Sequence, residues 1–280
     1  MPIIHDNTVM DIHNVALVIK HNSTYAEEVS RKTSRLLQER GSNVYTISPF
    51  SVEKGTMLNK LDELNDKDID LAIAVGGDGT TLKIVKAFAR SVPIFGIKGG
   101  GTRGILATID ADELEDGIQK IFSNSFHLEK RMRVYASVNG MKSAPALNEV
   151  FISRINVTRT PTYTIKFKED ELQQRMDGII ISTPTGSTGH SYSVGGPVLY
   201  EELDVLLLTP MNSVNRMPPL IFPDEPIEIR SNFETKIVVD GQDVFEIKPE
   251  ENIRVARYEH DAVFVRFKTK GLRQLAKLGF

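Results

Sequence analysis

One short segment constrains the fold of this chain more than any other: Gly-Gly-Asp-Gly-Thr at residues 76–80. It follows an apolar run that ends at Val75, and such a run is typical of a strand buried on both faces. Residues 80–90 then return to a helical pattern of apolar side chains. In an open α/β sheet, ligands bind where a strand ends and the next helix begins. The segment therefore predicts an α/β layer with a binding site at that edge.

Strand and helix patterns alternate through residues 1–125, which we expect to form an N-terminal α/β domain with a parallel, Rossmann-like sheet. Short apolar and β-branched runs predict its strands, at residues 15–19, 43–47, 70–75 and 93–97. Amphipathic patterns predict its helices, at residues 24–40, 80–90 and 112–122, and a weaker helical signal covers 51–67.

The pattern changes after residue 125. Strand-like alternation dominates, and turn dipeptides such as Asn139-Gly140 and Asp240-Gly241 separate the runs, which favours hairpins. We expect residues 126–270 to form a mostly β, sandwich-like domain, including a strand at 263–267. Residues 271–280 suggest a short helix that packs back on the first domain.

A second glycine-rich segment fits the spacing of a dinucleotide-binding fingerprint. Gly99, Gly101 and Gly104 follow the strand expected at 93–97. However, residues 105–109 are apolar and β-branched, so no long helix begins where the fingerprint needs one. We interpret the segment as a glycine-rich ligand loop, and the sheet as Rossmann-like without a Rossmann fingerprint.

Composition excludes several classes of protein. The 280 residues contain no cysteine, which excludes disulfides, thiolate nucleophiles and thiolate metal sites. The formal net charge of −3 differs from the basic balance of a general nucleic-acid binder. The N-terminus lacks a signal-peptide pattern, and no apolar run approaches the ~20 residues that span a bilayer. We therefore expect a cytoplasmic protein with neither nucleic acid nor membrane as partner.

Asp78 is the unusual residue of the first motif. Glycines allow a backbone to approach phosphates, but a carboxylate beside them is repelled unless it has a task there. Holding a metal ion or accepting a hydrogen bond from a substrate hydroxyl are both parts of phosphoryl-transfer sites. The alternative is a tight strand–helix turn in which Asp78 caps the helix.

Two further segments carry polar side chains. Residues 183–191 are dense in hydroxyls and glycine and lead to Gly-Gly-Pro at 195–197, which suits a polar ligand; the alternative is a Ser/Thr-rich surface loop. Asn148-Glu149 offers an amide for an adenine edge and a carboxylate for ribose hydroxyls. Taken alone, this pair favours an ordinary turn before a strand.

These segments, in this order, resemble the NAD kinase family, and archaeal members look most similar. The family's Gly-Gly-Asp-Gly-Thr motif corresponds to residues 76–80, and its Asn-Glu pair to 148–149. Its long Asp-Gly…Thr-Pro-Thr-Gly-Ser-Thr…Gly-Gly-Pro motif corresponds to 177–197, and its Asp-Gly-Gln to 240–242. The resemblance implies an enzyme that phosphorylates the adenosine-ribose 2′-hydroxyl of NAD to give NADP, with ATP or polyphosphate as donor.

The resemblance also implies a role for single residues. Asp78 would be the catalytic base toward the ribose hydroxyl. The residues implied to bind NAD are Asp78, Gly79, Asn148, Glu149, Asp177, Thr185, Thr188, Gly189, His190, Asn212 and Gln242. Those assigned to the phosphoryl donor are Gly77, Thr80, Lys98 and Arg103. The six histidines show no metal-ligand spacing, so Mg²⁺ is expected to arrive on the donor phosphates rather than in a protein cage.

The chain departs from the family pattern at two segments. His190 stands where many members have tyrosine, which keeps a ring but adds a titratable nitrogen. In the segment 96–106, Lys98 replaces an asparagine and one extra residue is present. Lys98 and Arg103 would favour a polyanionic donor.

The resemblance further implies a homodimer or homotetramer whose site is completed by a neighbouring subunit, through Asp177 and Asn212. Two alternatives stay open. A lipid or sphingoid-type kinase shares the Gly-Gly-Asp-Gly-Thr loop, and a non-catalytic dinucleotide sensor would bind NAD without transferring phosphate.

Overall fold

The computed structural model describes residues 10–99, 105–268, 275 and 278–279. The chain divides into two compact units: unit 1 comprises residues 1–130 and 262–280, and unit 2 comprises 131–261. Among the described residues, no helix is both long and apolar enough to cross a membrane.

Unit 1 is built on one eight-stranded sheet, counted over the described residues, with the order β3-β2-β1-β4-β5-β20-β7 and β6 paired to β5. Its central strands run parallel, as the alternation predicts. The strands are β1 (Asn14–Ile19), β2 (Asn43–Ile47), β3 (Thr56–Leu58), β4 (Leu71–Gly76), β5 (Pro93–Lys98), β6 (Ile109–Asp110), β7 (His127–Arg131) and β20 (Ala262–Arg266).

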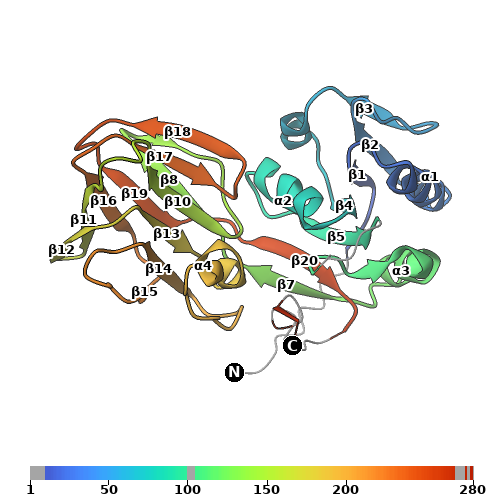
Figure 1. Ribbon diagram of the computed structural model, residues 1–280. Helices are drawn as coiled ribbons and strands as arrows, with labels where there is room; N and C mark the ends of the chain where they lie inside the picture. The colour runs from blue at the N-terminus through green and yellow to red at the C-terminus, as the bar shows by residue number, and fades with distance from the viewer. Residues whose placement is uncertain (1–9, 100–104, 269–274, 276–277, 280) are drawn as a thin grey trace. The chain divides into compact units, whose positions relative to one another are not determined.

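Helices cover both faces of this sheet. Figure 1 shows α2 (Asp78–Ala87) on one face, with α1 (Thr24–Gln38) and α3 (Leu114–Phe122) on the other. The apolar sides of α1 and α3 pack with alternate residues of β1, β4 and β5 in one core. Ser23 begins α1 by accepting a hydrogen bond from the Ala26 N–H, and Gly41 follows the helix with a φ of 88°. The predicted parallel α/β layer is confirmed.

Two segments of unit 1 differ from the expected pattern. Residues 51–67 form β3 and the short 3₁₀ helix η1 (Leu61–Asp66) instead of one helix. The strand expected at 263–267 in the β domain is β20, and it pairs in parallel with β5 in unit 1. The chain thus returns to the first sheet at residue 262, before the expected boundary at 270. The apolar pattern of β20 alone does not indicate which sheet the strand joins.

Unit 2 consists of two antiparallel sheets. One has the order β15-β14-β13-β10-β17-β18 and the other β12-β11-β16-β19-β8-β9. The first contains β10 (Glu149–Arg154), β13 (Gly178–Ser182), β14 (Val205–Met211), β15 (Leu220–Pro223), β17 (Thr235–Val239) and β18 (Asp243–Ile247). The second contains β8 (Val134–Val138), β9 (Met141–Lys142), β11 (Thr162–Phe167), β12 (Asp170–Arg175), β16 (Ile227–Ser231) and β19 (Ile253–Arg257).

A single core fills the space between these two sheets. It takes inward-facing residues from both, such as Ile152 and Ile181 from the first and Ile165 and Val255 from the second. Alternation along each strand places such residues on one face, which is how a sandwich is packed. The predicted sandwich-like domain is confirmed. Between β13 and β14 lie two short helical pieces, η3 (Thr185–Thr188) and α4 (His190–Ser193).

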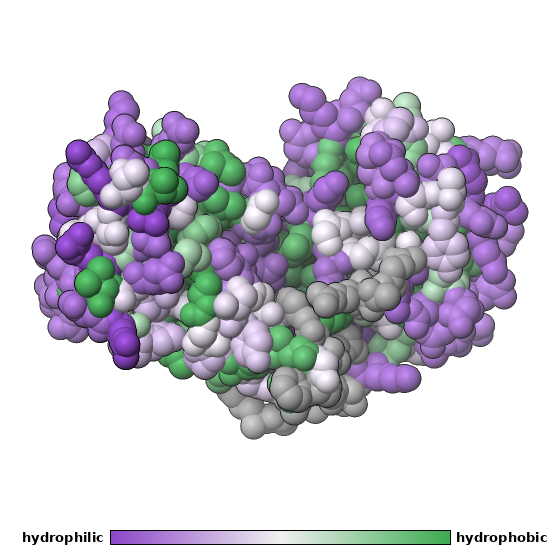
Figure 2. Space-filling model, viewed as in Figure 1, coloured by the Kyte–Doolittle hydropathy of each residue, from purple (hydrophilic) through white to green (hydrophobic). Residues whose placement is uncertain are grey.

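Polar side chains dominate the surface of unit 1 around α1 and β3 in Figure 2, and hydrophobic side chains form small areas among polar ones elsewhere on this face. Exposed large apolar residues are spread over separate strands and loops, for example Met57, Val157, Val214 and Ile221. Scattered residues of this kind are normal for a protein surface.

Candidate functional site

The Gly-Gly-Asp-Gly-Thr segment lies where β4 ends and α2 begins. Gly76 is the last residue of β4, Gly77 precedes the helix, and Asp78 is its first residue. Because β1, β4 and β5 are parallel neighbours, their carboxyl ends meet at this edge of the sheet. The structure therefore places Gly77, Asp78, Gly79 and Thr80 where the sequence predicts a ligand site.

Asp78 is held by Leu106, which lies between β5 and β6. Its Oδ1 accepts a hydrogen bond of 3.0 Å from the Leu106 N–H. Gly77 is the N-cap residue, and no side chain caps this helix. Asp78 therefore does not act as the helix cap, which removes the simplest structural explanation for a carboxylate in this loop. Its Oδ2 makes no hydrogen bond to a described residue, so it can serve a ligand.

Close packing explains two of the glycines at this edge. A Cβ on Gly99 would lie 2.9 Å from the Gly76 nitrogen, and one on Gly76 would lie 2.3 Å from the Thr80 Oγ1. The Gly99 N–H also donates to the Gly76 carbonyl at 3.2 Å. The ends of β4 and β5 can thus approach each other and α2 only because both positions lack a side chain.

Lys98 is the last residue of β5 and stands next to Gly76 in the strand register. Its Nζ lies 3.4 Å from Asp110 Oδ1, and about a third of its side chain is exposed. Arg103, the other cation predicted for the donor, lies outside the described residues. Lys98 is therefore at the edge that carries Asp78, with part of its charge balanced by Asp110.

In unit 2, the start of β10 and the two residues before it are held by Asp240, to which the sequence analysis assigned no site role. Asp240 Oδ2 accepts from the Leu147 N–H at 2.8 Å, and Oδ1 accepts from the Asn148 and Glu149 N–H groups at 2.9 and 3.1 Å. Asp240 has a φ of 45°, as the turn dipeptide with Gly241 predicts. The Asp-Gly-Gln motif was the available signal, but only the fold reveals that its carboxylate positions the Asn-Glu pair.

The hydroxyl-dense segment 183–191 is a buried structural element. Thr183 Oγ1 donates to the Leu147 carbonyl at 2.6 Å, and Ser187 Oγ donates to the Pro184 carbonyl at 2.7 Å. Ser191 Oγ lies 2.7 Å from Thr209 Oγ1. The expectation that these hydroxyls face a ligand is wrong for these three residues, because each has a protein partner and little exposed surface. Sequence pattern does not separate a ligand-facing hydroxyl from one that fixes a loop.

Three of the four remaining predicted residues of this segment lie on its more open side. Thr185, Gly189 and His190 are half-buried, whereas Thr188 is buried and donates to the Thr185 carbonyl at 3.5 Å. A Cβ on Gly189 would be 3.5 Å from Glu149 Oε2, so the Asn-Glu pair and this segment adjoin.

His190 packs edge-on against Phe151 of β10, with ring centroids 4.8 Å apart and an interplanar angle of 76°. Burial lowers the pKa of His190 below its ordinary value of 6.5. Burial therefore favours the neutral imidazole, which presents a ring surface beside Phe151.

Asp177 and Asn212 are brought together, whereas Gln242 stands apart from them in the hairpin turn. Asn212 Nδ2 donates to Asp177 Oδ2 at 3.0 Å, and Arg154 Nη1 lies 3.0 Å from Asp177 Oδ1. Gln242 is exposed, and its N–H donates to the Val239 carbonyl at 2.9 Å. The predicted pair thus forms one polar cluster at the ends of β13 and β14.

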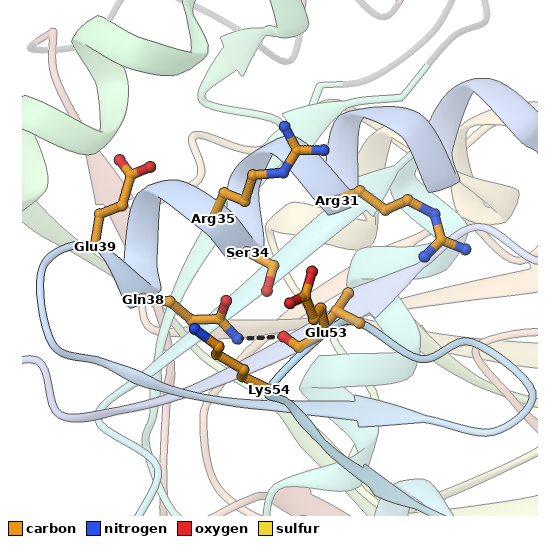
Figure 3. A pocket seen from close by; sticks show the side chains of 8 residues that line it. Arg31, Ser34, Arg35, Gln38, Glu39, Glu53 and Lys54 are labelled. Atoms are coloured by element: carbon orange, nitrogen blue, oxygen red, sulfur yellow. Dashed lines mark hydrogen bonds between the residues drawn. The ribbon is translucent and has the colours of Figure 1, made fainter.

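A surface cavity of about 410 Å³ lies between α1 and the loop before β3. Figure 3 shows the side chains that line it, with Gln38 Nε2 donating to the Glu53 carbonyl at 2.7 Å. None of the predicted site residues lines this cavity. Its charged lining residues have both signs and are Arg31, Arg35, Glu39, Glu53 and Lys54. The mixture of charges does not select a ligand, so this cavity is not the candidate site.

The described side chains do not form a metal-binding cage of their own. Among the described residues, no group of three or more His, Cys, Asp or Glu side chains could hold an ion. Mg²⁺ is commonly bound through one or two carboxylates plus substrate phosphates, and Asp78 supplies one carboxylate at the glycine-lined edge. The donor set therefore fits an ion that binds together with a phosphorylated ligand.

Comparison with known proteins gives a consistent result along the chain. Residues 15–126 match the ATP-NAD kinase N-terminal domain family, and residues 147–267 match the ATP-NAD kinase C-terminal domain family. The NAD kinase of Methanoculleus marisnigri is 32% identical over 263 residues, which cover 90% of this chain and 93% of that protein. The NAD kinase of Clostridium botulinum is 30% identical over 268 residues, which cover 92% of each chain.

Solved structures show the same similarity in the fold. Yeast NADH kinase complexed with NADH has a TM-score of 0.86 at 23% identity, over 96% of this chain and 88% of that one. An NAD kinase from Archaeoglobus fulgidus in complex with ATP has a TM-score of 0.74 at 27% identity, over 95% and 97%.

Proposed function

The chain belongs to the NAD kinase family and is an NAD kinase, and from that premise we propose that Asp78 directs phosphoryl transfer to the 2′-hydroxyl of the adenosine ribose of NAD. The observation that carries this proposal is the position of the Asp78 carboxylate. It stands at the glycine-lined start of α2, it is oriented by the Leu106 N–H, and it does not serve as the helix cap.

In this reaction the ribose oxygen attacks the terminal phosphorus of the donor, the bond from that phosphorus to its bridging oxygen breaks, and the shortened donor leaves. Phosphoryl transfer depends mostly on positioning and on neutralising charge. Asp78 orients the hydroxyl and accepts its proton late in the step, which it then releases to water. Because Oδ1 is held by Leu106, Oδ2 is the oxygen assigned to the hydroxyl.

Unit 2 is proposed to supply the NAD-binding side chains. Asn148 would contact the adenine and Glu149 the ribose. Asp240 accepts from both of their N–H groups, and the preceding Leu147 is held by Asp240 and by the Thr183 hydroxyl. The other proposed NAD contacts are Gly79, Asp177, Thr185, Thr188, Gly189, His190, Asn212 and Gln242. Among these, Thr188 contributes through its backbone, since its side chain is buried.

ATP is the proposed donor, in keeping with the ATP complex of the archaeal relative. Gly77, Thr80, Lys98 and Arg103 are assigned to its phosphates. Mg²⁺ would be held by Asp78 together with the donor phosphates, and when bound it would neutralise their charge.

We also propose that the enzyme is cytoplasmic, because ATP and NAD are available there. We further propose a homodimer or homotetramer in which Asp177 and Asn212 approach the nicotinamide bound by a neighbouring subunit.

The test is a donor-by-acceptor assay. The purified protein is incubated with NAD, Mg²⁺ and either ATP or polyphosphate, and NADP is detected with an NADP-specific dehydrogenase. NADP formed with ATP supports the proposal, and NADP formed only with polyphosphate reassigns the donor. Measurable NAD binding without NADP from either donor overturns it in favour of a sensor, and transfer to a lipid alcohol alone would favour a lipid kinase. Light scattering checks the oligomeric state separately.

A further inference from the structure

Lys20, which belongs to none of the motifs, lies at the same edge of the unit 1 sheet. The β1–β4 register pairs Ile19 with Val75, and the Lys20 N–H donates to the Val75 carbonyl at 2.8 Å, which places Lys20 opposite Gly76. The β4–β5 register pairs Gly76 with Lys98. Lys20, Gly76 and Lys98 therefore form one row across three neighbouring strands.

This row faces α2. The residue before each member of the row packs in the core with α1 and α3, and side chains alternate between the faces of a sheet. A second observation agrees: a Cβ on Gly76 would lie 3.0 Å from the Lys20 Cβ and 2.3 Å from Thr80 Oγ1 of α2. Lys20 and Thr80 are thus on the same side of Gly76 as the start of the helix that carries Asp78.

The strand order places this row at the point where ligands bind in open α/β sheets. From β1 the chain proceeds outward to β2 and β3, and β4 then begins on the other side of β1. The crevice between the carboxyl ends of β1 and β4 is the topological switch point. Lys20 and Gly76 are the two residues that flank it.

The two lysines of the row differ in how far their positive charges are balanced by an acidic neighbour. Lys98 is 3.4 Å from Asp110, whereas Lys20 is exposed and makes no ion pair with a described residue. Gly76, which has no side chain, separates them. An anion at this edge would therefore meet the full charge of Lys20 and a partly balanced charge on Lys98.

We propose that Lys20 binds the phosphate chain of the phosphoryl donor, on the opposite side of Gly76 from Lys98. The inference rests on the proposed function and adds a donor-binding residue that lies outside all the motifs. An ammonium offers three hydrogen-bond donors to phosphate oxygens, but it does not discriminate between nucleobases. Lys20 should thus act on the phosphate chain whether it belongs to ATP or to polyphosphate, and it should leave NAD binding unaffected.

The experiment compares Lys20→Ala with Lys54→Ala, each of which removes one exposed positive charge from unit 1. Lys54 precedes β3 and so lies at the amino edge of the same sheet. Initial rates give kcat and KM for ATP, polyphosphate and NAD, thermal unfolding gives stability, and calorimetry gives ATP binding in the presence of Mg²⁺. Lys20→Arg tests rescue by a second cation.

For Lys20→Ala we expect KM for ATP and the ATP dissociation constant to rise about tenfold, equivalent to ~1.4 kcal/mol. KM for polyphosphate should rise in parallel, KM for NAD and the melting temperature should stay unchanged, and Lys20→Arg should recover most of the loss. The difference in ATP affinity between Lys20→Ala and the unmodified protein should shrink at high ionic strength.

An unchanged affinity for ATP in Lys20→Ala would overturn the inference, and so would an equal loss in Lys54→Ala. A parallel rise in KM for NAD would also overturn it, since that indicates a structural role. If the unmodified protein forms no NADP, the proposed function fails, and the ATP calorimetry still decides the role of Lys20.

Discussion

Each unit contains a region with candidate site residues, and the two regions are held in place in different ways. At the edge of the unit 1 sheet, strand ends and glycines set the geometry, and Asp78 makes one hydrogen bond to a backbone N–H. In unit 2, side chains hold the backbone: Asp240 accepts three N–H groups, and Thr183 binds the Leu147 carbonyl. In the first region a side chain can therefore change without moving the backbone, whereas in the second it cannot.

This comparison leads to different expectations for substitutions in the two regions. Changing a functional group in unit 1 should alter catalysis at nearly constant stability. Changing a supporting group in unit 2 should alter stability and NAD affinity together. The following experiments test that contrast, in order of decreasing expected effect.

The largest effect is expected for Asp78→Asn. The amide oxygen can still accept from the Leu106 N–H, so the loop should keep its conformation, but it is a poor proton acceptor. Loss of a general base typically costs ~10²- to 10⁴-fold in rate. Turnover should fall by that factor while NAD affinity and melting temperature stay close to those of the unmodified protein. A variant that keeps most of its turnover would remove Asp78 from the chemistry.

Asp240→Ala should show the opposite behaviour. Three backbone N–H groups lose a charged acceptor, and one hydrogen bond to a charged group is worth about 1.5–3 kcal/mol. We expect a loss of roughly 3 kcal/mol in the free energy of unfolding, measured by denaturant titration, and a raised KM for NAD. Asp240→Asn keeps one accepting oxygen and tolerates the positive φ. It should therefore recover part of the lost stability and part of the affinity for NAD. Unchanged stability would contradict the supporting role.

A pair of glycine substitutions isolates the packing difference. A Cβ on Gly186 would lie 2.1 Å from the Asn148 carbonyl oxygen, whereas one on Gly79 meets no atom within 4 Å. Gly186→Ala should destabilise the protein by about 1–3 kcal/mol through overpacking. Gly79→Ala, in the first turn of α2, should leave stability unchanged or slightly raised. Equal melting temperatures for the two variants would show that position 186 tolerates a Cβ as well as position 79 does.

The smallest effect concerns pH. Burial lowers the pKa of His190, so the folded protein takes up this proton at lower pH than the unfolded chain does. Below the ordinary value of 6.5 the unfolded state binds more protons, and stability therefore falls as the pH falls. His190→Tyr keeps a ring against Phe151 but should lose this contribution. Melting temperatures of both proteins at pH 7.5 and at lower pH measure it; parallel curves would contradict the assignment.

The fold could be predicted largely from local patterns. Strand β2 begins and ends where its apolar alternation does, and the turn dipeptide Asn139-Gly140 gives a hairpin with both φ angles positive. Patterns failed for residues 51–67, where weak amphipathicity did not decide between helix and strand. They also left open the partner of β20, because strand pairing is a long-range contact.

The sequence by itself determined the chemistry at each motif: a carboxylate among glycines at 76–80, an amide and a carboxylate at 148–149, and the order of these segments. Those features depend on residue type and short spacing, which are local. Only the tertiary structure decided that the Ser187 and Ser191 hydroxyls hold a loop, that Asp240 supports Asn148 and Glu149, and that Lys20 stands beside Gly76. Each of these contacts joins residues whose proximity is set by strand register, turn geometry or packing. Local sequence patterns therefore did not predict these contacts.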